Sequence, residues 1–155
     1  MPDPQPTIGS LIHEVARLMR KRFEQNARNS GLTRSQWQAI AYLSKHEGIH
    51  QAALADLLEI EPITLVRILD KLEDRGLIER RRHETDRRIW LLFLKDAARP
   101  LLADMQPIAE TTRAEALEGV SSENRDRLFD TLNVMKTNLM AANRAPIPEK
   151  EAYYG

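Results

Sequence analysis

Apolar residues recur at the three- and four-residue spacing of an amphipathic helix in several stretches of the chain. In the first stretch they are Ile8, Leu11, Ile12, Val15, Leu18, Met19 and Phe23. This spacing predicts a helix that ends near residues 29–31 and carries basic residues on its other face. A second helix is expected from Thr33, which would cap it together with Gln36, to about His46.

Two further helices, separated by only three residues, are expected in the centre of the sequence. The first covers Gln51 to Leu58. The second begins at Pro62, a residue that a helix tolerates in its first turn, and ends at Gly76. The short break between them predicts a helix-turn-helix.

A β-hairpin is expected directly after the helix-turn-helix. Residues 77–82 and 88–94 flank the polar residues 83–87, and the second segment is rich in Ile, Trp, Leu and Phe. This pattern predicts two short strands joined by a mobile tip.

The remainder of the chain predicts two more helices. The first runs from about residue 96 to 117, bent or irregular at Pro100 and Pro107. Ser121 is expected to cap the last helix, whose apolar positions include Leu128, Leu132, Met135 and Leu139.

These elements together predict a mainly α fold with a small β-hairpin, an α+β arrangement. We expect a winged helix-turn-helix over residues 32–95 and N- and C-terminal helical regions over 8–30 and 96–143. Flexible ends are expected at residues 1–7 and 144–155.

Composition narrows the possible functions. The chain has 155 residues, no cysteine and a formal net charge of zero. Disulfides, thiolate nucleophiles and cysteine-based zinc sites are therefore excluded, and the four histidines lack metal-ligand spacing. The polar, proline-rich start and the lack of a long apolar run predict a cytoplasmic protein without membrane contact. No metal or cofactor is expected.

Positive charge is concentrated in one short stretch. Six arginines lie between residues 75 and 88, namely Arg75, Arg80, Arg81, Arg82, Arg87 and Arg88. We expect Asp86 to brace the hairpin tip and Arg87 to enter a DNA minor groove, with Arg80, Arg82 and Arg88 on phosphates. The alternative is a surface hairpin whose acidic residues merely neutralise the arginines.

The second helix of the helix-turn-helix is the expected reader of DNA bases. Its first turns would expose Pro62, Ile63, Thr64 and Arg67, and an arginine there reaches guanine O6 and N7 as a bidentate donor. Thr64 suits a phosphate or base, and Pro62 and Ile63 suit thymine methyl groups. The alternative is that these are ordinary solvated helix positions.

Residues 32–37 (LTRSQW), 60–78 (IEPITLVRILDKLEDRGLI) and 86–88 (DRR) resemble the MarR family, closest to its SlyA-like branch. The similarity extends from about residue 10 to 142. It implies a homodimeric transcriptional regulator that binds a near-palindromic operator, an inverted repeat in double-stranded DNA. The resemblance also implies release by a small phenolic or carboxylate effector.

Some positions depart from the pattern of the family. Glu59 stands where relatives often have glycine, which would cost strain if its φ is positive. Residues 90–93 (WLLF) replace a more polar strand, and Lys95 replaces a threonine that often opens the next helix.

The resemblance also implies a dimer interface and a ligand pocket. The apolar faces of the first and last helices would pair across a twofold axis; the alternative is that both helices cap the core of a monomer. The pocket would draw on Arg17, Arg20, Thr33, Trp37 and Arg67. Trp37 also fits the alternative of a core residue, and Arg17 and Arg20 could pair with nearby glutamates instead.

Two other classes of function fit the sequence less well. A winged-helix protein-interaction module without DNA binding would carry an acidic or apolar wing, whereas this one is basic. An enzyme would need a nucleophile with a base or a cluster of carboxylates, and the sequence has no such constellation.

Overall fold

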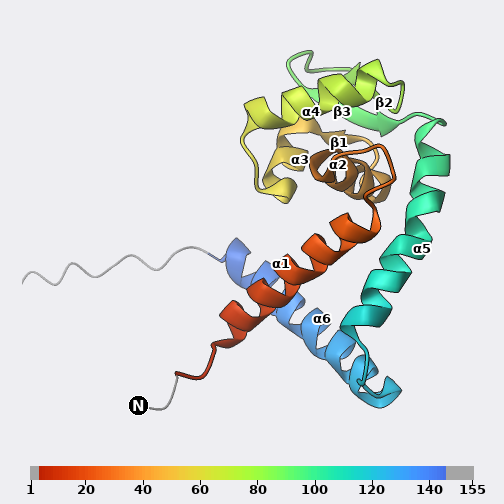
Figure 1. The fold of residues 1–155 in the computed structure, drawn as a ribbon. Helices are drawn as coiled ribbons and strands as arrows, with labels where there is room; N and C mark the ends of the chain where they lie inside the picture. The colour runs from red at the N-terminus through yellow and green to blue at the C-terminus, as the bar shows by residue number, and fades with distance from the viewer. Residues whose placement is uncertain (1–3, 146–155) are drawn as a thin grey trace, which may run out of the picture. The chain divides into compact units, whose positions relative to one another are not determined.

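The computed structural model describes residues 4–145. The elements follow in the order α1 (Ile8–Asn26), α2 (Arg34–Lys45), β1 (Ile49–His50), α3 (Gln51–Leu58), α4 (Pro62–Asp74), β2 (Ile78–Arg82), β3 (Trp90–Leu94), α5 (Ala98–Ala116) and α6 (Ser122–Arg144) (Figure 1). The expected α+β fold, mainly helical with a small antiparallel sheet, is confirmed. The expected flexible ends fall largely on residues 1–3 and 146–155, which lie outside the described residues.

The chain divides into two compact units, one ending at Ala116 and the other beginning at Leu117. Within the first unit, we call residues 32–95, which contain the elements from α2 to β3, the winged unit. The proposed dimerisation regions, 8–30 and 96–143, stay predictions. No helix among residues 4–145 is both long enough and apolar enough to cross a membrane.

The start of α2 follows from its first residues. The Thr33 side chain accepts a hydrogen bond from the Gln36 backbone N–H at 3.3 Å, and the Gln36 side chain accepts one from the Thr33 backbone N–H at 3.2 Å. This reciprocal capping box, predicted from the sequence, satisfies two backbone donors that a helix start otherwise leaves unpaired.

The turn between α3 and α4 is built on a left-handed residue. Glu59 has φ 54° and ψ 43°, and it is the one residue other than glycine with positive φ among the described residues. The Ile60 backbone N–H then bonds the Ala55 carbonyl at 3.1 Å, which closes α3 in a Schellman arrangement. Pro62 opens α4 at a position that needs no backbone donor.

A three-stranded antiparallel sheet packs beside these helices in the order β1-β3-β2. Residue Arg80 of β2 lies opposite Leu92 of β3, and Ile49 of β1 pairs with Leu92 from the other side. The sequence did not reveal β1, because two residues are too short to show an alternating pattern. The third strand also begins later than predicted, since Arg88 belongs to the turn of the wing.

The core joins the helix-turn-helix to the sheet. Its large, fully buried side chains are Ile40, Leu43, Leu54, Leu65, Leu69, Leu72, Ile78 and Leu92. Each leucine or isoleucine removed from water in this way contributes about 1.5–3 kcal/mol of stabilisation. A second cluster, formed by Ala27, Trp37 and Met105, joins α1, α2 and α5.

Two long helices follow the sheet. Helix α5 runs continuously through both Pro100 and Pro107. In the second unit, the Ser121 side chain caps α6 as predicted, accepting from the Asn124 backbone N–H at 3.2 Å. The Arg125 guanidinium donates to the carbonyls of Val120 and Leu117, which holds the turn before α6.

Candidate nucleic-acid interface and cavity

The first turns of α4 present a mixed polar and apolar surface. Pro62, Ile63, Thr64 and Arg67 are all exposed, whereas Leu65 on the opposite face is fully buried. Helical periodicity accounts for Ile63, Thr64 and Arg67, because Arg67 lies four and three residues after the other two and shares their side of the helix. Pro62 is exposed because it opens the helix, although it lies three residues before Leu65.

The loop between β2 and β3, residues 83–89, is held by two side chains. His83 Nδ1 accepts hydrogen bonds from the backbone N–H groups of Thr85 and Asp86, both at 3.2 Å. Asp86 Oδ1 accepts from the Arg88 backbone N–H and from its Nε, both at 3.1 Å, and Oδ2 accepts from Nη2 at 3.2 Å. The Arg88 guanidinium and backbone lower the pKa of the Asp86 carboxyl below its ordinary value.

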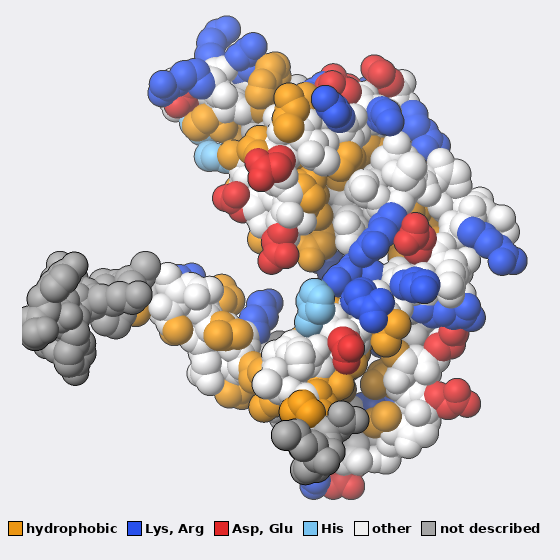
Figure 2. Space-filling model, turned by 60° about the vertical axis from the view of Figure 1, so that its left-hand side comes forward, with side chains coloured by type: hydrophobic (Ala, Val, Ile, Leu, Met, Phe, Trp, Pro, Cys, Tyr) orange, Lys and Arg blue, Asp and Glu red, His pale blue; other side chains and the backbone are white. Residues whose placement is uncertain are grey.

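Asp86 was expected to brace the hairpin tip, and its partner in the structure is Arg88. The contribution of His83 was missed, because its role depends on the loop curling back onto the ring and the sequence contains no separate signal for that. The Arg87 side chain is exposed, and its backbone carbonyl accepts a hydrogen bond from Arg82. Figure 2 shows Lys and Arg side chains gathered in groups on the surface rather than evenly spread.

The three consecutive arginines of β2 have different environments. Arg80 is paired with Asp70 and Glu73 of α4, and only 18% of its side chain is exposed. Arg81 pairs with Glu79 and lies over the Phe93 ring. The Arg82 guanidinium lies over Trp90, 4.2 Å from the ring centre.

Phosphate contacts were expected from Arg80, Arg82 and Arg88. In the structure the Arg80 guanidinium is already bonded to two carboxylates, so this side chain faces α4 rather than open solvent. Alternation along β2 separates Arg80 from Arg81, because successive side chains of a strand project to opposite faces. Among the described residues, only Arg80 pairs with carboxylates of α4. Arg80 lowers the pKa of the Glu73 carboxyl through this hydrogen bonding.

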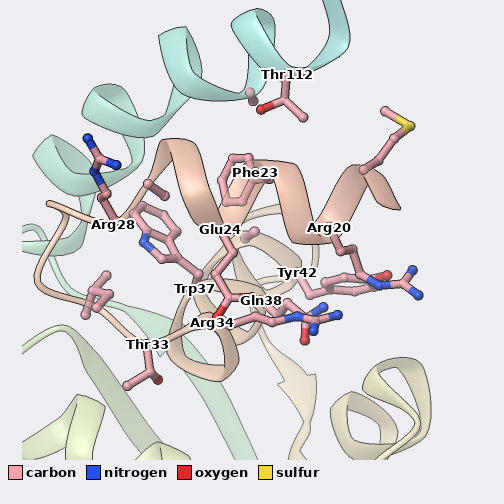
Figure 3. A pocket seen from close by; sticks show the side chains of 15 residues that line it. Arg20, Phe23, Glu24, Arg28, Thr33, Arg34, Trp37, Gln38, Tyr42 and Thr112 are labelled. Carbon is pink, nitrogen blue, oxygen red and sulfur yellow. The ribbon is translucent and has the colours of Figure 1, made fainter. Parts of the chain in front are cut away.

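A cavity of about 720 Å³ lies between α1, α2 and α5. Phe23 of α1 and Trp37 of α2 form an aromatic wall, their rings in an edge-to-face contact with centres 6.4 Å apart (Figure 3). Arg20, Arg28 and Arg34 carry positive charge around this wall, against the single carboxylate of Glu24. Such a cavity suits a planar, anionic small molecule.

Three of the five residues expected in a ligand pocket line this cavity: Arg20, Thr33 and Trp37. Arg17 and Arg67 do not line it. Arg17 lies almost one turn before Arg20 on α1, and Arg67 belongs to α4, which contributes no residue to the lining. Trp37 is also a core residue, 5% exposed, and its Nε1 donates to Ser30 Oγ at 2.9 Å.

Two helices carry exposed apolar side chains, some of which appear as orange patches in Figure 2. On α1 these are Ile8, Leu11, Ile12, Val15 and Leu18, and on α6 they include Leu128, Phe129, Leu132, Leu139 and Met140. All are at least 40% exposed. Neither helix contains a buried residue among those described.

The described residues contain no group of three or more His, Asp or Glu side chains arranged to hold a metal ion.

A family model and several solved structures are similar to this chain. A model of the MarR family matches residues 30–89, which include α2, α3, α4 and the wing loop. A MarR transcriptional regulator from Methanosarcina mazei Go1 is 27% identical, with a TM-score of 0.77; 87% of this chain and 97% of that chain are covered. The resemblance to the MarR family is confirmed, whereas the SlyA-like branch stays a prediction.

Two further solved structures extend the comparison. The transcriptional repressor CouR, bound to a 23-mer DNA duplex, is 28% identical over 84% of this chain and 92% of that chain, with a TM-score of 0.69. Apo wild-type MarR from E. coli is 19% identical over 85% of this chain and 98% of that chain, with a TM-score of 0.77. This match shows that the two chains have a similar fold.

Proposed function

We propose that this chain, whose residues 30–89 match the MarR family, is a transcriptional regulator that binds a near-palindromic operator as a homodimer. The matched family comprises transcription regulators and not enzymes. The observation that carries the proposal is an exposed α4 start beside an arginine-bearing wing loop. The DNA complex of the related repressor CouR supports the same conclusion. A regulator must reach the chromosome, so a cytoplasmic location is part of the proposal.

In this proposal α4 lies in the major groove. A helix about 10–12 Å across fits a groove about 12 Å wide. Arg67 reaches a guanine edge, Thr64 bonds a base or phosphate, and Pro62 and Ile63 contact thymine methyl groups. All four side chains are exposed, and Ile63, Thr64 and Arg67 lie on one side of the helix, which is the arrangement that direct readout requires.

The wing supplies contacts beside the recognition helix. Arg87 enters the minor groove, because its side chain is exposed while its backbone is fixed through Arg82. Asp86 holds the loop through Arg88, and Arg82 and Arg88 contact phosphates.

The test is selection of bound genomic fragments followed by fluorescence anisotropy at two salt concentrations. We expect an inverted repeat to bind with a Kd of about 10⁻⁸ M and to weaken as salt rises. Arg87→Ala should weaken operator binding more than the control Arg99→Ala, which lies on α5 outside the wing. If no fragment binds above random DNA, the winged-helix interaction module becomes the better account.

The homodimer is supported by the exposed apolar residues of α1 and α6. Soluble monomers rarely leave large contiguous apolar patches in water, so a second copy is the partner that symmetry favours. Such a dimer would set two α4 helices about 34–36 Å apart, the spacing of one DNA turn.

Light scattering at micromolar concentration tests the dimer. Leu11→Glu and Leu128→Glu should each give the mass of a monomer. The control Leu57→Glu changes an equally exposed leucine of α3 and should leave the dimer intact. A wild-type protein with the mass of a monomer would refute this part of the proposal.

The cavity between α1, α2 and α5 is the proposed effector site. Its aromatic wall and three arginines suit a small aromatic carboxylate, and α2, which is part of the winged unit, forms one side of the cavity. Benzoate and naphthoate are suitable probes. One of them should quench Trp37 fluorescence and release the operator, Arg20→Gln should weaken both effects, and Arg17→Gln should leave them unchanged.

A further inference from the structure

The Arg80 side chain connects the wing to the recognition helix. Its Nε donates to Glu73 Oε2 at 3.2 Å and its Nη2 donates to Glu73 Oε1 at 3.0 Å, so this carboxylate is gripped by two donors. The same Nη2 donates to Asp70 Oδ1 at 2.7 Å. One guanidinium on β2 thus binds two carboxylates on successive turns of α4.

This contact lies where it can fix the position of the wing relative to α4. Ile78, at the start of β2, is fixed in the hydrophobic core, and Arg80 lies two residues further along the strand toward the wing tip. On α4, Asp70 lies three residues after Arg67, the proposed base-reading arginine. Arg80 therefore joins the middle of β2 to the part of α4 that follows the reading face.

We infer that Arg80 is a positioning residue that fixes the wing to α4, so that both elements meet DNA as one rigid reader. The inference rests on the proposed DNA-binding function. It differs from the phosphate contact expected for Arg80, because the guanidinium is directed to two internal carboxylates.

A fixed angle between α4 and the wing matters more for binding to specific sites than for binding to random DNA. Specific binding needs α4 in the major groove and Arg87 in the minor groove at the same time, so it depends on the geometry between them. Random DNA is bound mainly through phosphates, which a loosely held wing still reaches. Loss of the Arg80 contact should therefore reduce discrimination rather than general affinity.

The double variant Arg80→Gln/Glu73→Gln tests the inference, because it removes the contact without altering net charge. The matched control is Arg81→Gln/Glu79→Gln. It removes the neighbouring ion pair of the same strand, also without a change of charge, and this pair makes no bond to α4.

Affinity for the operator and for random DNA would be measured for each full-length protein over a range of salt. We expect the operator-to-random ratio to fall about tenfold in the first variant, from the usual range of about 10³–10⁷. The slope of affinity against salt should stay unchanged, and the control should keep the wild-type ratio. An unchanged operator-to-random ratio overturns the inference. An equal loss of affinity for operator and random DNA also overturns it if the salt slope falls by about one, because that result is expected for the loss of a phosphate contact.

Hydrogen exchange of the DNA-free proteins tests the role of the Arg80 contact independently of the proposed DNA binding. Amides of β2 and β3 should exchange faster in the first variant than in the control, and equal exchange overturns the inference even if the wild type binds no DNA. If the double variant fails to fold by circular dichroism, Asp70→Asn/Glu73→Gln replaces it. That variant should lose discrimination although its added positive charge favours DNA, and retained discrimination would overturn the inference.

Discussion

Replacing Glu59 by glycine should stabilise the protein. Glu59 ends α3 in the left-handed region, at φ 54°, where a Cβ atom crowds the following carbonyl oxygen. Its side chain is exposed and makes no hydrogen bond or ion pair with any of residues 4–145. The substitution therefore removes strain without removing a contact.

The size of the effect follows from two opposing contributions. A left-handed conformation costs a residue with a Cβ about 1–2 kcal/mol relative to glycine. Glycine loses more conformational freedom on folding, which costs about 0.5–1 kcal/mol. The difference favours Glu59→Gly by about 0.5–1 kcal/mol, which for a chain of this length raises the melting temperature by about 1–4 °C.

Urea and thermal unfolding of Glu59→Gly and Glu59→Ala measure this difference. Both variants remove the same negative charge, but alanine keeps the Cβ and hence the strain. Only the glycine variant should gain stability. Equal changes in the two variants would show that charge, and not backbone conformation, is responsible, and a less stable glycine variant would refute the strain argument.

Three further predictions concern the core, the cavity and acid stability. Leu65→Ala should lower the free energy of unfolding by about 2–5 kcal/mol in urea, because the side chain is fully buried. Trp37→Phe keeps an aromatic wall but loses the bond to Ser30, and should cost about 1 kcal/mol in the same assay. Arg80 lowers the pKa of the Glu73 carboxyl from its ordinary value of 4.5. The ion pair therefore stabilises the folded state fully above pH 4.5, and this stabilisation is lost as the pH falls through the lowered pKa of Glu73. Urea midpoints of wild type and Glu73→Gln should therefore differ at neutral pH and converge in acid.

The helices and caps were predictable because their signals are local. Thr33 with Gln36, Pro62 and Ser121 each act on backbone groups within a few residues, so the sequence alone contains the cause. Strand β1 was not predictable in this way, because its two residues are defined by pairing with β3, more than 40 positions away.

The site was predictable in its location but not in its pairings. Helical spacing was enough to assign Ile63 and Thr64 to one exposed face. Nothing in the sequence distinguishes Arg80 from Arg82, because both have the same side chain on the same strand. Their partners depend on how the sheet packs against α4 and on where Trp90 lies across the hairpin, and both relations are tertiary.

These pairings explain how a chain of zero net charge can attract DNA. Of the six arginines between residues 75 and 88, Arg80, Arg81 and Arg88 are paired with carboxylates, whereas within residues 4–145 no carboxylate pairs with Arg75, Arg82 or Arg87. Arg82 precedes the wing loop and Arg87 lies within it, so uncompensated charge lies where contact is proposed. Because charges act over only about 8–10 Å at physiological salt, acidic residues far from the wing do not cancel this attraction. The salt dependence of operator binding should accordingly report fewer phosphate contacts per protomer than six arginines suggest.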